Sequence, residues 1–516
     1  MGLAKTQGGT VIGVDATIVK VEVNITATGT PKYFLVGLPD NAVREGIHRI
    51  EAAIKNSDLT MPRARIVVNM APADLRKEGS AYDLTIAVGI LEASQRLAAI
   101  KNIEEYLIMG ELSLDGSLRP IKGALPIAIQ ARKDKYKGFI LPKQNAREAA
   151  IVNDIEVYGA DNLNEVLQFL SGDINISATV IDTRNEFENR LIERLVDFSD
   201  VKGQKNIKRA LEIAASGGHN VILVGPPGAG KTMLAKRLPT ILPPLSLHEA
   251  LETTKIHSVA GKLSANASLV AVRPFQSPHH TISDVALVGG GNIPQPGQIS
   301  LAHNGVLFLD ELPEFKRTVL EVLRQPMEER SVTISRARFS VDYPASFMLV
   351  ASMNPCPCGY YNHPEKECVC APGVVQKYLN KISGPLLDRI DLHVEVTPVS
   401  FDELSGQENS EGSDTIRERV VQAREVQKIR FKKNKQLYCN AQMPSSMVRK
   451  LCTIDQAGQT LLKTAMQRLG LSARAYDRIL KVARTIADLD NSDVIKIEYL
   501  AEAIQFRTLD RENWAS

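Results

Sequence analysis

The chain has 516 residues, of which 44% are hydrophobic and 23% are charged, and its formal net charge is +3. A single hydrophobic core rarely grows beyond about 250–300 residues, so this length predicts at least two folded domains. The composition excludes a chain that is disordered throughout, and the nearly balanced charge excludes binding to nucleic acid through bulk charge alone. Residues 1–9 lack the apolar core of a signal peptide, and no segment is apolar over the about 18 residues of a membrane span, so we expect a cytoplasmic protein.

The first third of the chain alternates short β-branched runs with helical patterns, which predicts an α/β or α+β domain. Strands are expected at 10–14, 20–25, 33–37, 65–69, 106–109 and 138–141, and helices at 41–56 and 81–94. This alternation is lost after residue 170, where the sequence becomes polar. We therefore expect a domain over 1–170 and a linker over 171–196.

A phosphate-binding motif follows the apolar strand expected at 221–224. The motif G-x-x-x-x-G-K-T is formed by Gly225, Pro226, Pro227, Gly228, Ala229, Gly230, Lys231 and Thr232, and a helix is expected at 233–238. Backbone N–H groups in such a loop wrap phosphates, while the lysine reaches the β and γ phosphates and the hydroxyl binds magnesium. A chance glycine-rich turn is disfavoured because both the strand and the helix are present.

Two further apolar runs end in polar residues that suit ATP hydrolysis. The run 305–309 ends at Asp310 and Glu311, and the run 346–351 ends just before Asn354. An aspartate at a strand end beside a phosphate loop can hold magnesium, and the following glutamate can orient the attacking water. Asn354 can position the same water, although an asparagine that caps a turn before proline fits its local sequence equally well.

A cysteine-rich loop begins two residues after Asn354 and is expected over 356–370. It contains four of the six cysteines of the chain, namely Cys356, Cys358, Cys368 and Cys370. Clustered cysteines in a reducing compartment more often bind metal than form disulfides, so the loop predicts a tetrahedral zinc site, with His363 as a substitute ligand. A redox-sensitive or simply packed group of thiols is the alternative.

The C-terminal part of the chain is predicted to be helical. We expect an ATP-binding core over 197–400 and a helical lid over 401–516 that begins with a charged, mobile loop at 405–414. Helical patterns occur at 416–433, 444–451, 455–468, 473–489 and 496–505.

Together, these motifs resemble an AAA+ ATPase of the magnesium-chelatase and replicative-helicase branch. The resemblance implies a segment at 197–204 that packs on adenine and contributes Val201, an insertion at 273–291, and a β-hairpin at 330–345 that faces DNA. Arg330, Arg336 and Arg338 of the hairpin could contact phosphates, although arginines on an ordinary solvated strand face are an equal alternative without the resemblance.

The same resemblance implies roles for arginines in the second half of the chain. Arg389, within 386–391, is similar to the arginine finger that acts on the nucleotide of a neighbouring subunit. This role would require a ring or at least a dimer, and we expect a hexameric ring. Arg474 is similar to the second sensor in the lid, with Arg478, one turn later, as the runner-up.

The N-terminal motifs at 36–40, 77–84, 110–116 and 120–123 resemble the proteolytic domain of Lon. With the chelatase-type core and lid, this order of domains resembles the YifB/ComM family over nearly the whole chain. Ser80 falls at the position of the Lon nucleophile, but the register of the basic lysine gives Leu125, so we expect no proteolysis and interpret Ser80 as the N-cap of a helix beginning at Ala81.

The predicted fold class is thus α/β multidomain: a Lon-like α+β domain, an AAA+ core with a parallel sheet, and a helical lid. The family implies an ATP-hydrolysing ring motor that acts on DNA, such as a helicase or branch-migration factor in recombination or natural transformation, with ATP, Mg²⁺ and Zn²⁺ as cofactors. A magnesium-chelatase-type subunit, a chaperone-like switch without DNA motor activity and an ATP-dependent protease are the alternatives.

Overall fold

The computed structural model describes residues 2–26, 31–95, 102–182, 196–263, 268–291, 294–336, 339–361, 363, 365–398, 410–434 and 437–507, without the side chains of residues 336, 339 and 372. The chain forms two compact units, one of Met1–Arg190 with Leu247–Val270 and one of Leu191–Ser246 with Ala271–Ser516. None of the helices in the described parts is long and apolar enough to cross a membrane.

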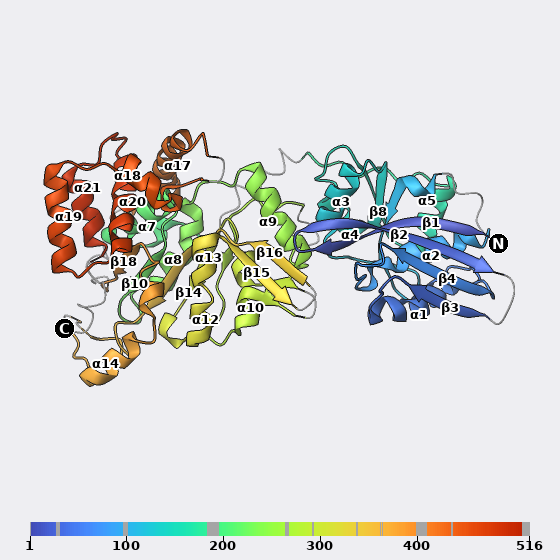
Figure 1. The fold of residues 1–516 in the computed structure, drawn as a ribbon, viewed down its shortest axis with the longest axis horizontal. Coiled ribbons are helices and arrows are strands. Elements are labelled where there is room, and N and C mark those ends of the chain that lie inside the picture. Colours follow the sequence, from blue (N-terminus) through green and yellow to red (C-terminus); the bar gives the residue numbers. More distant parts are fainter. Residues whose placement is uncertain are drawn as a thin grey trace. The chain divides into compact units, whose positions relative to one another are not determined.

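The first unit is built on a seven-stranded sheet in the order β3-β4-β2-β1-β5-β8-β9 (Figure 1). Its strands are β1 Leu3–Ile12, β2 Asp15–Thr26, β3 Lys32–Val36, β4 Arg65–Ala71, β5 Tyr106–Ile108, β8 Gly138–Pro142 and β9 Glu156–Ala160. The pairs β1/β2 and β2/β4 are antiparallel and the remaining pairs are parallel. In β2 every second residue from Val19 to Ile25 is buried, which is the period-2 pattern of a strand with one face on a core.

Helices cover this sheet, and one of them comes from a distant part of the chain. The helices are α1 Asn41–Asn56, α2 Asp83–Ala93, α3 Ala124–Lys133, α4 Lys143–Ala149, α5 Leu163–Ser171 and α9 Leu247–Val259, and a short ribbon is formed by β6 Glu111–Leu112 and β7 Leu118–Arg119. Helix α2 is buried along ten of its eleven residues, which explains its nearly continuous apolar sequence. Strands and helices therefore alternate as predicted.

Helix α9 falls within the predicted core of 197–400 but clusters with the other compact unit. Residues 247–270 belong to the N-terminal unit, not to the ATP-binding unit. The Gly123 amide donates to the Ser258 carbonyl at 3.2 Å, and the Ser258 hydroxyl donates to the buried Glu148 carboxylate. Burial raises the pKa of Glu148, while the hydrogen bond from Ser258 opposes that shift. This docking buries one side of α9, and the sequence of the helix gives no sign of which domain it packs against.

The second unit has a five-stranded, fully parallel sheet in the order β11-β14-β17-β10-β18. Its strands are β11 Phe275–Gln276, β14 Val306–Leu309, β17 Met348–Met353, β10 Val221–Val224 and β18 Leu392–Glu395. Its helices and turns are η3 Phe198–Asp200, α7 Lys205–Gly217, α8 Lys231–Ile241, α10 Asp284–Val288, α11 Gln298–Leu301, η4 Leu312–Glu314, α12 Arg317–Glu321, α13 Arg324–Glu329, α14 Pro372–Leu379 and α15 Gly384–Leu387. The three central strands are buried throughout, as parallel strands covered on both faces should be.

Two small ribbons project from this core, β12 Gly289–Gly290 with β13 Gln295–Pro296, and β15 Ser331–Arg336 with β16 Phe339–Pro344. They contact each other, because the Tyr343 hydroxyl donates to the Pro294 carbonyl at 2.8 Å and Ile334 packs against Gly289. The predicted hairpin therefore exists and rests on the predicted insertion.

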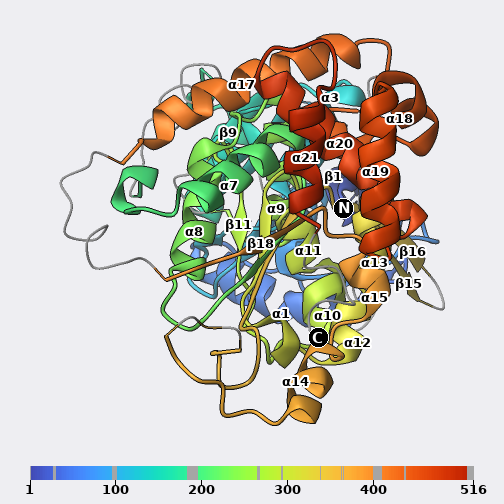
Figure 2. The same cartoon turned by 90° about the vertical axis from the view of Figure 1, so that its left-hand side faces the viewer.

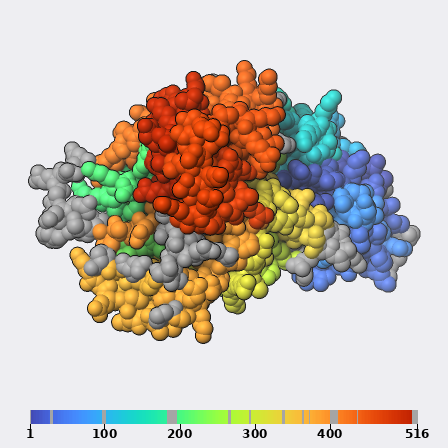
Figure 3. All heavy atoms as spheres, turned by 60° about the vertical axis from the view of Figure 1, so that its left-hand side comes forward, coloured from blue at the N-terminus to red at the C-terminus, as the bar shows by residue number. Residues whose placement is uncertain are grey.

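The lid is a bundle of helices, α17 Ser413–Arg430, α18 Ser445–Leu451, α19 Gln456–Arg468, α20 Ala473–Leu489 and α21 Ile497–Gln505, with the turn η5 Asn440–Gln442. Figure 2 shows α19, α20 and α21 side by side, and Figure 3 shows the lid, in red, as one continuous surface. Each helix begins within three residues of its predicted start. Of the expected linker and mobile loop, residues 183–195 and 405–409 lie outside the described residues.

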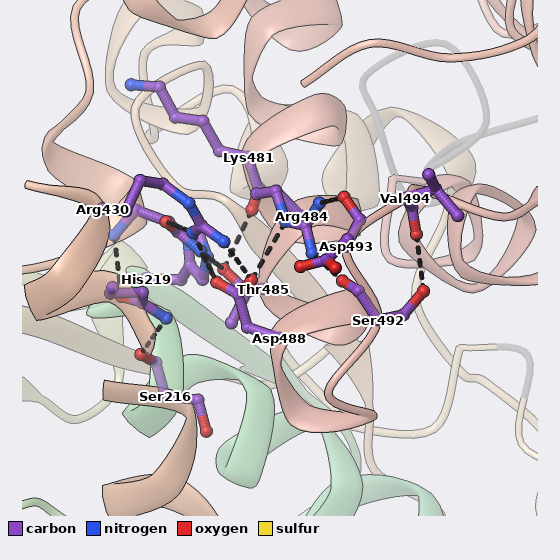
Figure 4. Close-up of polar contacts among 12 residues, drawn as sticks. Ser216, His219, Arg430, Lys481, Arg484, Thr485, Asp488, Ser492, Asp493 and Val494 are labelled. Carbon is purple, nitrogen blue, oxygen red and sulfur yellow. Dashed lines mark hydrogen bonds and ion pairs between the residues drawn. The ribbon is translucent and has the colours of Figure 1, made fainter. Parts of the chain in front are cut away.

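A buried polar network joins the lid helices to one another and reaches the core at one contact described below (Figure 4). Asp488 is fully buried and its carboxylate accepts from Arg430, from Arg484 at 3.0 Å and from Asn440 at 2.8 Å. On the same helix, Thr485 lies 2.9 Å from the ring of the buried His219, which follows α7. Buried charges need such complete pairing, so Asp488 ties the lid helices to one another, and the contact of Thr485 with His219 joins them to the core. The predicted fold class, with its AAA+ core, N-terminal domain and helical C-terminal domain, is confirmed.

Candidate functional site

The phosphate loop connects β10 to α8. Gly228 and Gly230 have φ of 80° and 83°, a left-handed conformation that glycine adopts without strain. Gly225 is required for close packing, because a Cβ there would lie 2.3 Å from the Val396 carbonyl oxygen. The loop therefore has the backbone freedom and the compactness that wrapping a phosphate requires, and its position before α8 directs a helix N-terminus at the bound group.

Lys231 lies inside this loop. Its ammonium group donates to the carbonyls of Gly225 at 2.7 Å and Pro226 at 2.8 Å, and to Asn354 Oδ1 at 3.1 Å. Burial lowers the pKa of Lys231, while the carboxylates of Asp310 and Glu311 oppose that shift. A largely buried ammonium group can bind an anionic ligand such as a phosphate. The nearby carboxylates suit a ligand that binds together with a magnesium ion.

The predicted magnesium ligands lie together. The Thr232 hydroxyl donates to Asp310 Oδ2 at 2.7 Å, and the Ser352 hydroxyl donates to the other oxygen of the same carboxylate. Hydroxyl and carboxylate oxygens are the hard donors that magnesium prefers, so this pair fits the ion. Sequence reasoning missed Ser352, which stands two residues before Asn354 on the same strand end and could have been found from that position.

Glu311 and Asn354 stand on either side of this pair. Glu311 has φ of 54°, unusual for a residue other than glycine, and its side chain is 58% exposed. Asn354 follows β17 and reaches Lys231, which places the two predicted water-positioning groups at the carboxyl ends of adjacent parallel strands. Tyr378 is a further neighbour that the sequence did not reveal. It forms a hydrogen bond with the Asn354 backbone, and its pKa is raised by burial and then by nearby Glu314.

The segment before the core contacts both the phosphate loop and the lid. The Gln204 side chain donates to the Ala229 carbonyl at 2.8 Å, and the amide of Phe198 donates to Ser413 at 2.8 Å. Val201 is buried. Burial alone would raise the pKa of Asp197, but hydrogen bonds from Ser199 and from the start of α17 lower it to about 2. The segment thus lies beside the phosphate loop, and its contact with adenine stays a prediction.

Arg389 is placed differently from an exposed arginine finger. It is 5% exposed, its guanidinium pairs with Glu328 at 2.5 Å, and it also donates to the Pro385 carbonyl at 2.5 Å. It lines a cavity of about 420 Å³ together with Arg324. Burial lowers the pKa of Arg389, Glu328 opposes that shift, and the neighbouring arginines add to it. In this conformation the guanidinium is held within its own chain.

The two candidate sensor arginines on α20 have different surroundings. Arg474 is exposed in the first turn of the helix. Arg478 is half-buried and pairs with the buried Asp391, which also lies 3.5 Å from His219. The pKa of Asp391 is lowered by Arg478 against the effect of its burial. Arg474 is thus the member of the pair that is available to a ligand, while Arg478 supports the lid.

Of the three hairpin arginines, Arg330 is the one whose side chain lies within the described residues. Arg330 ends α13 and is half-buried, and burial lowers its pKa, an effect that nearby Cys439 of the lid opposes. Arg338 and the side chain of Arg336 lie outside the described residues. Thr333 and Ser335 form the exposed face of β15, while Val332 and Ile334 are buried.

The four loop cysteines form a cluster in which all sulfur atoms lie within 4.8 Å of one another. Cys356 Sγ is 3.3 Å from Cys358 Sγ and 3.6 Å from Cys368 Sγ, and no disulfide joins them. A tetrahedral zinc site with bonds of about 2.3 Å places its sulfurs roughly 3.8 Å apart, so the donor set fits zinc. The ring of His363 instead accepts from the amides of Glu365 and Lys366, each at 3.1 Å.

The N-terminal unit shows no Lon-like dyad among the described residues. The Ser80 hydroxyl donates to the Glu111 carboxylate, and Leu125 is fully buried in α3. The interpretation of Ser80 as a helix N-cap is wrong, since the residue opens a short 3₁₀ turn and α2 begins at Asp83 without a side-chain cap. The charged carboxylate of Glu111 is a strong acceptor, so the Ser80 hydroxyl donates to it.

Comparisons with known proteins agree with this architecture. The family model described as magnesium chelatase, subunit ChlI, matches residues 197–404, that of subunit ChlI of Mg-chelatase matches 21–145, and that of the ChlI C-terminal part matches 410–507. The chain is also similar to part of Lon protease 2 of Bacillus subtilis, at 32% identity over 28% of this chain and 27% of that protein.

Two relatives match over almost their whole length. The competence protein ComM of Haemophilus influenzae is 43% identical, over 99% of this chain and 98% of its own. The protein YifB of Escherichia coli is 45% identical, over 97% and 96%. Because the match includes the Lon-like unit, the core and the lid in one order, the chain belongs to the YifB/ComM family of magnesium-chelatase-like AAA+ ATPases.

Proposed function

We propose that this protein is an ATP-driven ring motor that acts on DNA, as a helicase or branch-migration factor in recombination or natural transformation. The observation that carries the proposal is the joined pair of ribbons, β12–β13 and β15–β16, on the same unit as the phosphate loop and the Thr232–Asp310 pair. A motor needs a nucleotide site and an element that moves with it, and here both belong to one compact unit.

In the ATP site, Lys231 and the loop amides bind the β and γ phosphates, and Thr232 with Asp310 would hold magnesium. A magnesium ion held there would supply positive charge that offsets the charge of the phosphates. Glu311 orients the attacking water and accepts its proton, while Asn354 orients the same water from the next strand end. The Asn354 contact with Lys231 links this water to the state of the phosphates.

The DNA part of the proposal is supported by the polar outer face of β15, with Thr333 and Ser335, and by Arg336 and Arg338 in the sequence at its turn. Hydroxyls and arginines contact phosphates without reading bases, which gives binding that is independent of sequence and weakened by salt. Such contacts suit a motor that moves along DNA.

The subunit arrangement is also proposed. Arg389 would act on the nucleotide of a neighbour in a hexameric ring, which requires its release from Glu328. Arg389→Ala should then bind ATP and fail to hydrolyse it, and mixing it with Lys231→Ala protein should restore part of the activity. Wild-type hydrolysis by Arg389→Ala protein alone would reject this role.

A zinc ion is proposed for the four cysteines as a structural clip. Protein purified with Cys368→Ser and Cys370→Ser should lose one equivalent of zinc and melt at lower temperature, since bound metal stabilises the folded state. Metal-free wild-type protein of full stability would reject the site.

The deciding experiment measures the ATPase rate without DNA, and with single strands, duplex and a four-way junction. Stimulation that is largest with the junction supports branch migration. Arg336→Ala with Arg338→Ala should weaken DNA binding and reduce its salt dependence, whereas Arg449→Ala, an exposed arginine on α18, should leave both unchanged.

A magnesium-chelatase-type subunit is the second candidate, favoured by the family-model matches to residues 197–404 and 410–507. It predicts an ATPase rate that no form of DNA changes and no salt-sensitive DNA binding. That result would remove the DNA motor and leave an ATP-dependent switch.

A further inference from the structure

We propose that Asn220 is a positioning residue for Arg389: it fixes the main chain from which the guanidinium projects, so that the arginine reaches a neighbouring subunit by turning its own side chain. Asn220 stands directly before β10, the strand that leads into the phosphate loop of its own subunit. The inference rests on the proposed role of Arg389 as an arginine finger, and the experiments below separate the two.

The side chain of Asn220 joins two segments that are far apart in the sequence. Its Nδ2 group donates to the Arg389 carbonyl at 3.2 Å, and its Oδ1 atom accepts from the amide of Leu349, in β17, at 2.8 Å. A carbonyl needs a donor and an amide needs an acceptor, so the two partners fix the orientation of the carboxamide. One short side chain thus ties the finger turn, residues 389–391, to a central strand of the sheet.

The main-chain groups of Asn220 hold the same turn. The Asn220 carbonyl accepts from the amides of Asp391 and Leu392, each at 3.0 Å, and the Asn220 amide donates to the Asp391 carboxylate at 3.0 Å. Leu392 is the first residue of β18, and it is paired with the first residue of β10. The finger turn is therefore bonded to the entrance of the strand that carries the phosphate loop.

Two arginines of the lid hold the finger turn from the other side. The buried Arg507, which follows α21, donates to the Ile390 carbonyl, and Arg478 of α20 pairs with the Asp391 carboxylate. Asp391 is itself buried, and a buried carboxylate that lost its donors would be strongly destabilised. The main chain of the finger turn is thus anchored by donors from both the core and the lid.

The side chain of Arg389 is held less firmly than its main chain. Its guanidinium donates to the Pro385 carbonyl at 2.5 Å and pairs with Glu328, whose side chain is 50% exposed. An ion pair with a half-exposed carboxylate stabilises little, because solvent screens the two charges. Rotation about the side-chain bonds can therefore move the guanidinium while the anchored main chain stays in place.

The anchored main chain gives this rotation a defined end point. A group that stabilises charge on a γ-phosphate must be placed closely, since an error of about 1 Å can cost roughly 100-fold in rate. If the finger turn shifted, the same rotation would carry the guanidinium past the phosphate. Because Asn220 also opens β10, the finger of one subunit keeps a fixed separation from the phosphate loop of that subunit.

The test is the steady-state ATPase rate of Asn220→Asp protein. Aspartate keeps an acceptor for Leu349 but turns an oxygen toward the Arg389 carbonyl, so we expect kcat to fall about 10- to 100-fold and KM for ATP to change less than about two-fold. Asn220→Ser removes both side-chain hydrogen bonds without adding a charge and should also lower kcat. In the Arg389→Ala background neither substitution should lower the rate further.

Asn380→Asp is the matched control, since Asn380 is exposed at the end of α14 and should leave kcat and KM unchanged. Melting temperatures establish which variants are folded. A wild-type kcat in folded Asn220→Asp and Asn220→Ser proteins overturns the positioning role.

Mixing experiments separate a misplaced finger from a damaged phosphate loop. In a mixed ring, Asn220→Asp protein supplies an intact phosphate loop and Lys231→Ala protein supplies a correctly placed finger, so mixing the two should restore part of the activity. Mixing Asn220→Asp with Arg389→Ala protein should restore none, because neither has a working finger. A low kcat that Lys231→Ala protein does not restore places the defect elsewhere and also overturns the proposal.

The Arg389→Ala protein decides the underlying role. If it hydrolyses ATP at the wild-type rate, Arg389 is not a finger and the positioning role of Asn220 fails with it. If Arg389→Ala protein is inactive and is restored by Lys231→Ala protein while Asn220→Asp protein behaves as the wild type, the finger stands and Asn220 does not position it.

Discussion

Gly359 lies in the cysteine loop and packs against Pro227 of the phosphate loop. Its substitution tests whether the position of one loop depends on the other. The residue is buried with φ of 86°, and a Cβ placed on it would lie 2.4 Å from Pro227 Cδ. Carbon atoms in normal contact are about 3.5–4.0 Å apart, so Gly359→Ala requires a displacement of roughly 1 Å. The proline ring cannot rotate away because it is part of the backbone, so the displacement falls on one of the two loops.

The cost can be worked out from these two terms. The left-handed backbone costs alanine about 1–2 kcal/mol and the overlap about 1–3 kcal/mol. If half of that sum displaces the phosphate loop, ATP binding weakens by roughly 1–2.5 kcal/mol, which is about five- to seventy-fold in Kd. The cysteines themselves are untouched, so zinc content should not change.

The assay pairs titration of a fluorescent ATP analogue with the metal content of the same samples. Gly373→Ala is the control, since no atom lies within 4 Å of its Cβ position and its φ is ordinary in α14. Wild-type affinity for ATP in Gly359→Ala protein would refute the idea that the cysteine loop sets the position of the phosphate loop.

Four further variants test the ATP site, the lid and the entry segment. Lys231→Ala should abolish detectable nucleotide binding, whereas Glu311→Gln should bind ATP and hydrolyse it at least about 100-fold more slowly, as measured by steady-state ATPase and analogue titration; equal turnover would show that another group orients the water. Asp488→Ala leaves two arginines unpaired in the lid and should cost about 3–5 kcal/mol in urea unfolding, against no measurable cost for the exposed Asp490→Ala. The pKa of Asp197 is lowered to about 2, whereas in the unfolded chain it is about 4. The ionised carboxylate therefore stabilises the fold above pH 4, and this stability is lost as the pH falls toward 2. Asp197→Asn should therefore lower the melting temperature at pH 6 but not at pH 2, and an equal loss at both would disprove the charge effect.

Much of the site was predictable because its chemistry is local in sequence. The motif from Gly225 to Thr232 needs a strand, a loop and a helix that adjoin one another in the chain, and periodicity reveals all three. The lid helices were predicted for the same reason. The approach of Asp310 to Thr232 was also foreseeable, since both follow strands of one parallel sheet and parallel strands end at the same edge.

Other features depended on contacts between residues far apart in the chain. No local pattern distinguishes an exposed arginine finger from Arg389 paired with Glu328. Likewise the sequence of α9 does not show which domain it packs on, and only its docking on α3 and Glu148 assigns it to the N-terminal unit.

The sequence by itself determined the nucleotide chemistry, the order of the domains and the cysteine donor set, because each is encoded by neighbouring residues with a fixed spacing. The tertiary structure alone decided which side chains restrain that chemistry. A buried ion pair or a packed glycine forms only when the fold brings two distant segments within a few ångströms, and neither segment carries the other's position in its own sequence.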